Sequence, residues 1–203
     1  MKKSVKKQWF LLLCIALLFM IPVNVQAASP SKGTVKKLYN ELLKKNTSYT
    51  WFRTLDINQD GVKELVVSKN GATYNQDQYF IYTVKNNSVV YIGKIFESTR
   101  FGDPNKKKAI YYNKKLKSVR QVGTGTYSVT FWLYKINKYK LQERLCCGGI
   151  YNRYSVFYKS SYGKKASYIT EKELNNFCET YFKKGCTQYV LYKNTSANRS
   201  AKL

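Results

Sequence analysis

The chain has 203 residues, with 36 Lys and Arg, 11 Asp and Glu, and no histidine, which gives a net charge of +25 at neutral pH. The lack of histidine excludes Ser-His-Asp triads and zinc sites with histidine ligands. A charge this positive favours anionic partners, such as an acidic cell-wall polymer, an acidic polysaccharide, a phospholipid surface or nucleic acid. A solvated basic exterior without a dedicated ligand accounts for the same composition equally well.

The first 27 residues have the organisation of a secretory signal peptide. Four lysines lie within the first seven residues, and an apolar stretch follows from Trp9 to Val23. Val25 and Ala27 then place small residues at −3 and −1, so we expect cleavage after Ala27. An uncleaved anchor is the alternative, but the stretch is shorter than the ~20 residues that a spanning helix needs. We therefore expect a secreted, extracellular protein, either free or associated with the cell wall.

Residues 28–203 are expected to form one domain, with no transmembrane segment once the signal peptide of residues 1–27 is removed. Removing the four lysines of the signal peptide leaves 32 basic and 11 acidic residues in the remaining 176, a net charge of +21. A chain of this length buries enough apolar surface for a single core. The sequence contains no repeat, low-complexity tract or linker that would divide it further.

Two segments carry apolar residues at the spacing of an α-helix. Over residues 34–46 the apolar stripe has lysines opposite it and consists of Val35, Leu38, Tyr39, Leu42 and Leu43. A second helix is expected after Thr170, which forms a capping-box pattern with Glu173. A short third helix is expected over residues 196–203.

Between these helices the chain is predicted to be β-structure. The expected strands are rich in Tyr, Val, Ile, Phe and Thr, and lie near residues 50–55, 63–68, 78–84, 89–96, 108–113, 117–122, 126–136, 139–146 and 150–158. Short connections join antiparallel neighbours, because parallel pairing needs long crossovers. The predicted fold class is therefore α+β, an antiparallel β-meander sheet flanked by an N-terminal and a C-terminal helix, with disulfide links between them.

The disulfide prediction depends on four cysteines that remain after the signal peptide: Cys146, Cys147, Cys178 and Cys186. An even number of cysteines in an exported chain indicates disulfides. A bond between the adjacent Cys146 and Cys147 is strained, so we expect each of them to pair with one of Cys178 and Cys186. A catalytic cysteine is the alternative, but the chain has no histidine to generate its thiolate.

The most specific motif is the nine-residue segment 56–64, Asp-Ile-Asn-Gln-Asp-Gly-Val-Lys-Glu. Its candidate metal ligands are the side chains of Asp56, Asn58 and Asp60, the backbone carbonyl of Val62, and the carboxylate of Glu64. Ca²⁺ prefers several oxygens at ~2.3–2.6 Å, and a glycine permits the sharp reversal between them. We therefore predict a structural Ca²⁺ site. The alternative is an Asp-Gly turn whose side chains hydrogen-bond only to the backbone.

The loop differs from an EF-hand, whose twelve-residue loop ends with an acid where this chain has Val67. It resembles the calcium loops of FG-GAP and similar β-rich extracellular domains. With the closing segment 194–199 (Asn-Thr-Ser-Ala-Asn-Arg), the chain resembles a diffuse group of small, largely uncharacterised secreted proteins and lipoproteins of Gram-positive bacteria. That resemblance implies export and a calcium-type loop, but no activity. The chain departs from the group in having Asn58 at the second ligand position, no lipidation motif and extra cysteines.

The leading functional hypothesis is a secreted, non-catalytic, calcium-stabilised protein that associates with an anionic or glycan surface of the cell envelope. Nucleic acid is not an expected partner, because no nucleic-acid-binding motif is present, and the sequence specifies no oligomeric state. The first alternative is a wall-polysaccharide hydrolase that uses two carboxylates, for which Asp77, Glu97 and Glu143 are the candidates. The second is a protein-interaction module, such as an inhibitor or adhesin, that uses a tyrosine-rich sheet face.

Overall fold

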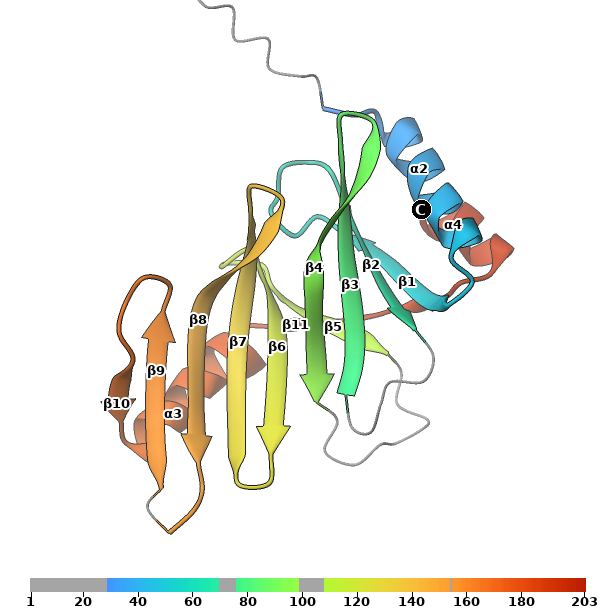
Figure 1. Cartoon of the computed structure of the whole chain (residues 1–203). Helices are drawn as coiled ribbons and strands as arrows, with labels where there is room; N and C mark the ends of the chain where they lie inside the picture. The colour runs from blue at the N-terminus through green and yellow to red at the C-terminus, as the bar shows by residue number, and fades with distance from the viewer. Residues whose placement is uncertain (1–28, 70–75, 99–107, 154) are drawn as a thin grey trace, which may run out of the picture.

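The computed structural model of the chain describes residues 29–69, 76–98, 108–153 and 155–203, so the expected signal peptide lies outside the described residues. A long sheet forms most of the described protein, with two helices beside one end and a third helix against the other end (Figure 1). The helices are α2 (Lys32–Lys45), α3 (Glu171–Cys178) and α4 (Ser196–Lys202), and α3 continues into a π-helical turn, η1 (Glu179–Lys183). No helix in the described ranges is long and apolar enough to cross a membrane.

The sheet contains 12 strands among the described residues, in the order β10-β9-β8-β7-β6-β4-β3-β2-β1-β12, with β5 and β11 paired to each other off this path. The strands are β1 (Tyr49–Leu55), β2 (Glu64–Lys69), β3 (Gln76–Lys85), β4 (Ser88–Ser98), β5 (Ala109–Asn113), β6 (Ser118–Gly125), β7 (Ser128–Asn137), β8 (Lys140–Ile150), β9 (Val156–Ser161), β10 (Ser167–Ile169), β11 (Thr187–Val190) and β12 (Tyr192–Lys193).

The predicted α+β class is confirmed, and the antiparallel meander is present in two runs, β1 to β4 and β6 to β10. Between these runs the sheet is mixed, because β4 and β6 pair in parallel at Glu97 and Val122. The prediction that all neighbours are antiparallel is wrong at this point. The chain leaves the sheet path after β4, forms β5 against β11 and returns as β6, so β4 and β6 are not joined by a short turn.

Strand β2 is buried on both faces, which explains its continuous apolar sequence. On one face Leu65 and Val67 pack in a cluster with Tyr39 and Leu43 of α2. On the other face Val66 belongs to a second cluster, which is built on β3 to β6. The apolar stripe predicted for the first helix is therefore confirmed as the surface that covers this half of the sheet.

Helix α3 covers the other half of the sheet and begins at the predicted capping box. The hydroxyl of Thr170 accepts from the backbone N–H of Glu173 at 3.3 Å, and the Glu173 carboxylate accepts from the N–H of Thr170 at 2.8 Å. Leu174 of α3 packs with Leu133 of β7 and with Phe182 of η1 in a third apolar cluster. This packing fixes which face of β7 and β8 is covered.

The predicted disulfides are not supported, because no pair of the described cysteines lies at bonding distance and all four are free thiols. The sulfur atoms of Cys147 and Cys178 are 3.4 Å apart in the cluster beneath α3. Cys146 interacts instead with Tyr158, on the opposite face of β8, because successive residues of a strand point to opposite faces. Cys186 donates to a backbone carbonyl of η1 at 3.3 Å. The predicted bridges from both Cys146 and Cys147 to Cys178 and Cys186 are therefore incompatible with the strand alternation, because Cys178 and Cys186 both belong to the cluster that Cys147 faces.

Candidate functional site

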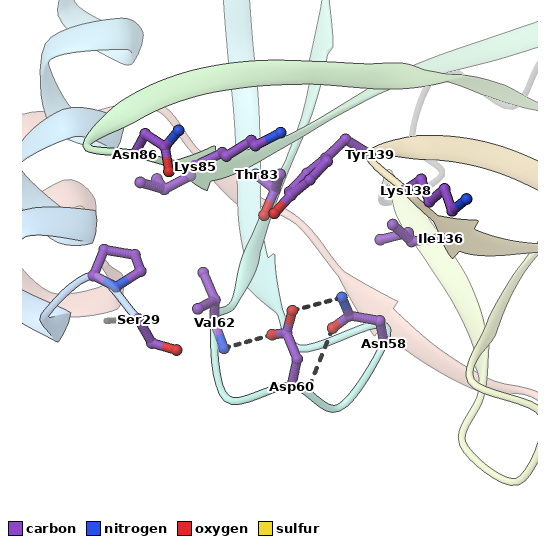
Figure 2. Close-up of a pocket in the computed structure, with 12 residues that line it drawn as sticks. Ser29, Asn58, Asp60, Val62, Thr83, Lys85, Asn86, Ile136, Lys138 and Tyr139 are labelled. Carbon is purple, nitrogen blue, oxygen red and sulfur yellow. Dashed lines mark hydrogen bonds between the residues drawn. The ribbon is translucent and has the colours of Figure 1, made fainter. Parts of the chain in front are cut away.

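The predicted metal loop joins β1 to β2 and closes through hydrogen bonds between its side chains and its own backbone. The carboxylate of Asp56 accepts from the N–H groups of Asp60 and Gly61, both at 3.1 Å. One oxygen of Asp60 accepts from the N–H of Val62 at 2.8 Å, and the other accepts from the amide of Asn58 at 2.7 Å (Figure 2). Gly61 has φ of +91°, so the reversal requires glycine at this position.

The loop is anchored to the body of the protein by the residues between its ligand candidates. Ile57 is completely buried in the core cluster of β3 to β6. Its carbonyl accepts from the hydroxyl of Tyr112 on β5 at 3.1 Å. The side chain of Gln59 donates to the carbonyl of Lys114 at 3.0 Å. Hydrophobic burial and these two hydrogen bonds therefore set the position of the loop against β5.

Glu64, the last ligand candidate, is completely buried at the start of β2. Its carboxylate accepts from the N–H of Ile57 at 2.8 Å and from the hydroxyl of Thr83 at 3.3 Å. Burial raises the pKa of Glu64 to about 8, and the negative charge of Asp60 adds to the rise, while the bond from Ile57 opposes it. The Glu64 carboxyl is therefore largely protonated near neutral pH when no cation is bound.

The structure thus brings the predicted ligands into one turn, and their hydrogen bonds are those of an Asp-Gly turn. Among the described residues, no group of three or more His, Cys, Asp or Glu is placed to hold a metal ion. The donor set nevertheless has the chemistry that Ca²⁺ prefers, because carboxylate and amide oxygens dominate it. A carboxylate oxygen that accepts one N–H also keeps a second lone pair for a cation.

A pocket of about 330 Å³ opens beside this loop (Figure 2). Asn58 and Asp60 line it from the loop, Lys85 from the end of β3, and Lys138 and Tyr139 from the β7–β8 turn. The ammonium group of Lys85 lies 4.3 Å from the centre of the Tyr139 ring. The pocket therefore combines one acid, two cations and one aromatic ring around the loop.

The sequence predicts the loop, but it does not predict which distant residues form the opposite wall of the pocket. Asn86 and Asn87 in the β3–β4 turn, and Lys138 and Tyr139 in the β7–β8 turn, all have positive φ. The asparagines are an ordinary signal for such a hairpin turn. Asn137 and Lys138 are likewise a turn signal between two expected strands, whereas the approach of both turns to the loop is a property of the folded sheet.

The hydrolase candidates Asp77 and Glu97 lie directly opposite one another on β3 and β4. Each is paired with its own cation, Asp77 with Lys108 and Glu97 with Arg120. Their side chains are 18% and 8% exposed, so both pairs are largely removed from water. The third candidate, Glu143, lies on β8, which the sheet order separates from β4 by β7 and β6. Glycoside hydrolysis needs one protonated acid and one free carboxylate, and two ion-paired carboxylates do not supply them.

The other chemical alternative, a reactive cysteine, lacks support at Cys146 and Cys186, whereas the hydrogen bond with Cys147 holds the pKa of the buried Cys178 thiol below its usual value. Burial raises the pKa of both Cys146 and Cys186 to about 11. A thiol with so high a pKa has little thiolate at neutral pH, and the thiolate is the nucleophile.

The tyrosines expected to form an interaction face are spread over several elements. The most exposed are Tyr91, Tyr127, Tyr162 and Tyr168, at 49%, 66%, 63% and 84%. They lie on β4, in the β6–β7 turn, in the β9–β10 turn and on β10. Scattered apolar residues of this kind are normal on a protein surface and do not mark an interface.

Comparison with protein-family models, curated proteins and solved structures finds no match to this chain. The resemblance to secreted proteins of Gram-positive bacteria therefore stays a prediction from the loop and the closing segment.

The pKa of Glu64 predicts how the stability of the metal-free protein depends on pH. The folded pKa of about 8 lies above the value of an exposed carboxyl, so between these values the folded state binds more protons than the unfolded state. The free energy of unfolding in EDTA should therefore fall as the pH rises from 5 to 8, by up to about 1.4 kcal/mol per pH unit for this group. Urea unfolding at a series of pH values measures the slope.

Glu64→Gln is the matched variant for this measurement. Its side-chain oxygen can accept from the N–H of Ile57, and its NH₂ group can donate to the hydroxyl oxygen of Thr83, which in the unmodified protein donates to the Glu64 carboxyl group. The variant should lose most of the decline above pH 5. Equal slopes for Glu64→Gln and the unmodified protein would show that this carboxyl does not titrate in that range.

Proposed function

We propose that this protein is a secreted, non-catalytic domain that binds an anionic or glycan polymer of the bacterial cell envelope and is stabilised by Ca²⁺. The observation that carries the proposal is a large excess of positive charge without acidic partners. The chain without its expected signal peptide has a net charge of +21. Within the described ranges, three ion pairs join Lys or Arg to Asp or Glu.

The positions of those three ion pairs support a surface role for the remaining cations. Two of the pairs are largely buried between strands, and the third links Glu179 to Lys183 within η1. Outside these two buried pairs the chain has far more basic than acidic residues, so most exposed lysines are not neutralised. A positively charged surface attracts polyanions and repels other positively charged molecules. The absence of histidine and the pairing of the candidate carboxylates favour binding over catalysis.

We assign the stabilising cation to the 56–64 loop, with Asp56, Asn58, Asp60, Val62 and Glu64 as the residues that would hold it. The support is the density of hard oxygen donors and the cost of keeping Glu64 charged beside Asp60 and Asp56 without a counter-ion. A bound cation would favour the ionised form of the Glu64 carboxyl. The cation would then act on stability, because it would hold the turn that joins β1 to β2.

We also propose that Cys147 and Cys178 form the one disulfide bond that joins α3 to the sheet. Their sulfur atoms lie 3.4 Å apart. Thiol–disulfide exchange would form the bond: the two thiols lose two protons and two electrons to the disulfide of an exchange partner, which leaves as a dithiol. Cys146 and Cys186 would remain thiols, because Cys146 faces away from α3.

Binding to the envelope through charge predicts release by salt. Exposed charges are screened over ~10 Å at 0.1 M ionic strength and over ~3 Å at 1 M. The protein should therefore bind isolated Gram-positive cell walls at low salt and be released by 1 M NaCl, whereas sucrose of equal osmolality should not release it. Sedimentation with the walls measures the bound fraction. Retention in 1 M NaCl, or no binding at low salt, contradicts the proposal.

Calcium binding predicts a higher melting temperature. A Kd of ~10⁻⁴–10⁻³ M, typical of extracellular modules, gives about 1.4–2.7 kcal/mol at 10 mM Ca²⁺, which corresponds to a rise of roughly 3–10 °C. Asp60→Asn should remove most of the rise, and Glu41→Gln, on the exposed side of α2, should keep it. An unchanged melting temperature with Ca²⁺ rejects the assignment of the cation.

The cysteine pairing predicts a single bridged peptide pair in the oxidised protein. Non-reducing peptide mapping should recover Cys147 joined to Cys178, with two thiols that react after unfolding. Cys178→Ser should lower the free energy of unfolding by about 3–4 kcal/mol relative to the oxidised protein, and Cys186→Ser should lower it less. A bridge that includes Cys146, or four free thiols after oxidation, would refute this pairing.

A further inference from the structure

A second pocket, of about 650 Å³, lies at the C-terminal end of α2, whereas the loop pocket is lined partly by residues that precede this helix. The end of α2, strand β1, and the segment that joins β12 to α4 form its walls. Figure 1 shows α2 and α4 side by side next to the edge of the sheet where β1 lies. The closing segment 194–199, which sequence analysis singled out without a role, supplies part of this wall.

Every charged side chain that lines this pocket is basic: Lys44, Lys193 and Arg199. Lys44 and Lys193 are exposed, and neither forms an ion pair within the described ranges. The ammonium group of Lys193 lies 5.9 Å from the centre of the Trp51 ring, which also lines the pocket. The pocket therefore combines uncompensated positive charge with an aromatic ring.

The guanidinium of Arg199 is held in place without being neutralised. Its Nη1 donates to the side-chain oxygen of Asn194 at 2.8 Å, and its Nε donates to that of Asn40 at 3.0 Å. Both acceptors are neutral amides, so the positive charge persists. The remaining nitrogen, Nη2, has no hydrogen-bond partner among the described residues and can donate to a ligand.

The same closing segment removes backbone acceptors that would repel an anion. The amide of Asn194 donates to the carbonyls of Leu43 and Tyr49, at 3.2 Å and 2.7 Å. The amide of Asn198 donates to the carbonyl of Lys193 at 2.9 Å. Asn194 therefore donates hydrogen bonds to backbone carbonyls at the end of α2 and in β1. Its side-chain oxygen also orients Arg199.

We propose that this pocket binds a phosphate group of a polyol-phosphate polymer, and so identifies the ligand class and the site for the envelope binding proposed above, on which it rests. The Nη2 of the Arg199 guanidinium, whose orientation Asn40 and Asn194 set, can donate to a phosphate oxygen, and the lysines add point charges around it. The face of the Trp51 ring suits the C–H groups of a sugar or polyol unit between two phosphates.

The test compares two double variants that remove the same charge. Lys44→Gln/Lys193→Gln removes two cations from the pocket, and Lys164→Gln/Lys165→Gln removes two exposed cations from the β9–β10 turn. Calorimetry with soluble poly(glycerol phosphate) in 0.15 M NaCl should show about 10-fold or more weaker binding for the pocket variant. The control variant should weaken binding by less than about 3-fold, since exposed charges contribute little at this ionic strength.

Arg199→Lys tests the contribution of the guanidinium hydrogen-bond donors separately from that of the positive charge. It keeps the positive charge but loses the planar donors, so it should weaken binding by about 10-fold, with thermal melting used to confirm that the variant folds. Polygalacturonate, a carboxylate polymer, should bind more weakly than poly(glycerol phosphate) to the unmodified protein. Vesicles that contain phosphatidylglycerol should not compete for the pocket.

The possible results distinguish a failure of the pocket assignment from a failure of the proposed envelope binding. If both double variants lose affinity equally, binding is spread over the surface, so the pocket assignment fails and the envelope-binding function stands. If the protein binds polygalacturonate as tightly as poly(glycerol phosphate), the pocket does not select phosphate. If vesicles that contain phosphatidylglycerol compete with the polymer, the ligand of the pocket is a lipid headgroup. If the unmodified protein binds neither the polymer nor isolated walls, both proposals fail.

Discussion

The carboxyl group of Glu64 is enclosed where the 56–64 loop enters β2, and its two hydrogen bonds join it to Ile57 near the start of the loop and to Thr83 of β3. Because β2 is buried on both faces, it joins the cluster beneath α2 to the cluster of β3 to β6. A polar group at such a position must be satisfied or it costs the full desolvation penalty. The protonation of Glu64, or a cation beside it, therefore affects the stability of both clusters together.

The acidic residues buried in the sheet are paired with cations, whereas the surface carries an excess of positive charge. Glu97 and Asp77 are used inside the sheet, where Arg120 and Lys108 compensate them. Removing one residue of such a buried ion pair is strongly destabilising, because the charge of the other residue is left unpaired. On the surface of the described ranges, most cations form no ion pair with an acid. This division explains why Asp77 and Glu97, two of the catalytic candidates, are structural.

The cysteines and the closing segment illustrate how neighbours in sequence acquire different roles. Cys146 and Cys147 are adjacent, yet β8 directs one toward Tyr158 and the other toward α3. In the same way, Asn194 lies just before α4 and donates to the Leu43 carbonyl of α2, whereas Arg199, within α4, donates to the side chain of Asn40. Short-range sequence patterns specify the local geometry, and the packing partner decides what each side chain contacts.

The sequence alone determined the elements with strong local signals: the apolar stripe of α2, the capping box at Thr170, the turn at Gly61 and most of the strand positions. These depend on contacts within a few residues, so periodicity and turn chemistry suffice to predict them. Only the tertiary structure decided the parallel pairing of β4 with β6, the burial of Glu64, the faces of Cys146 and Cys147, and the basic pocket around Arg199. Each of these depends on contacts between segments far apart in the chain, and a local pattern carries no information about which distant segment will lie beside it.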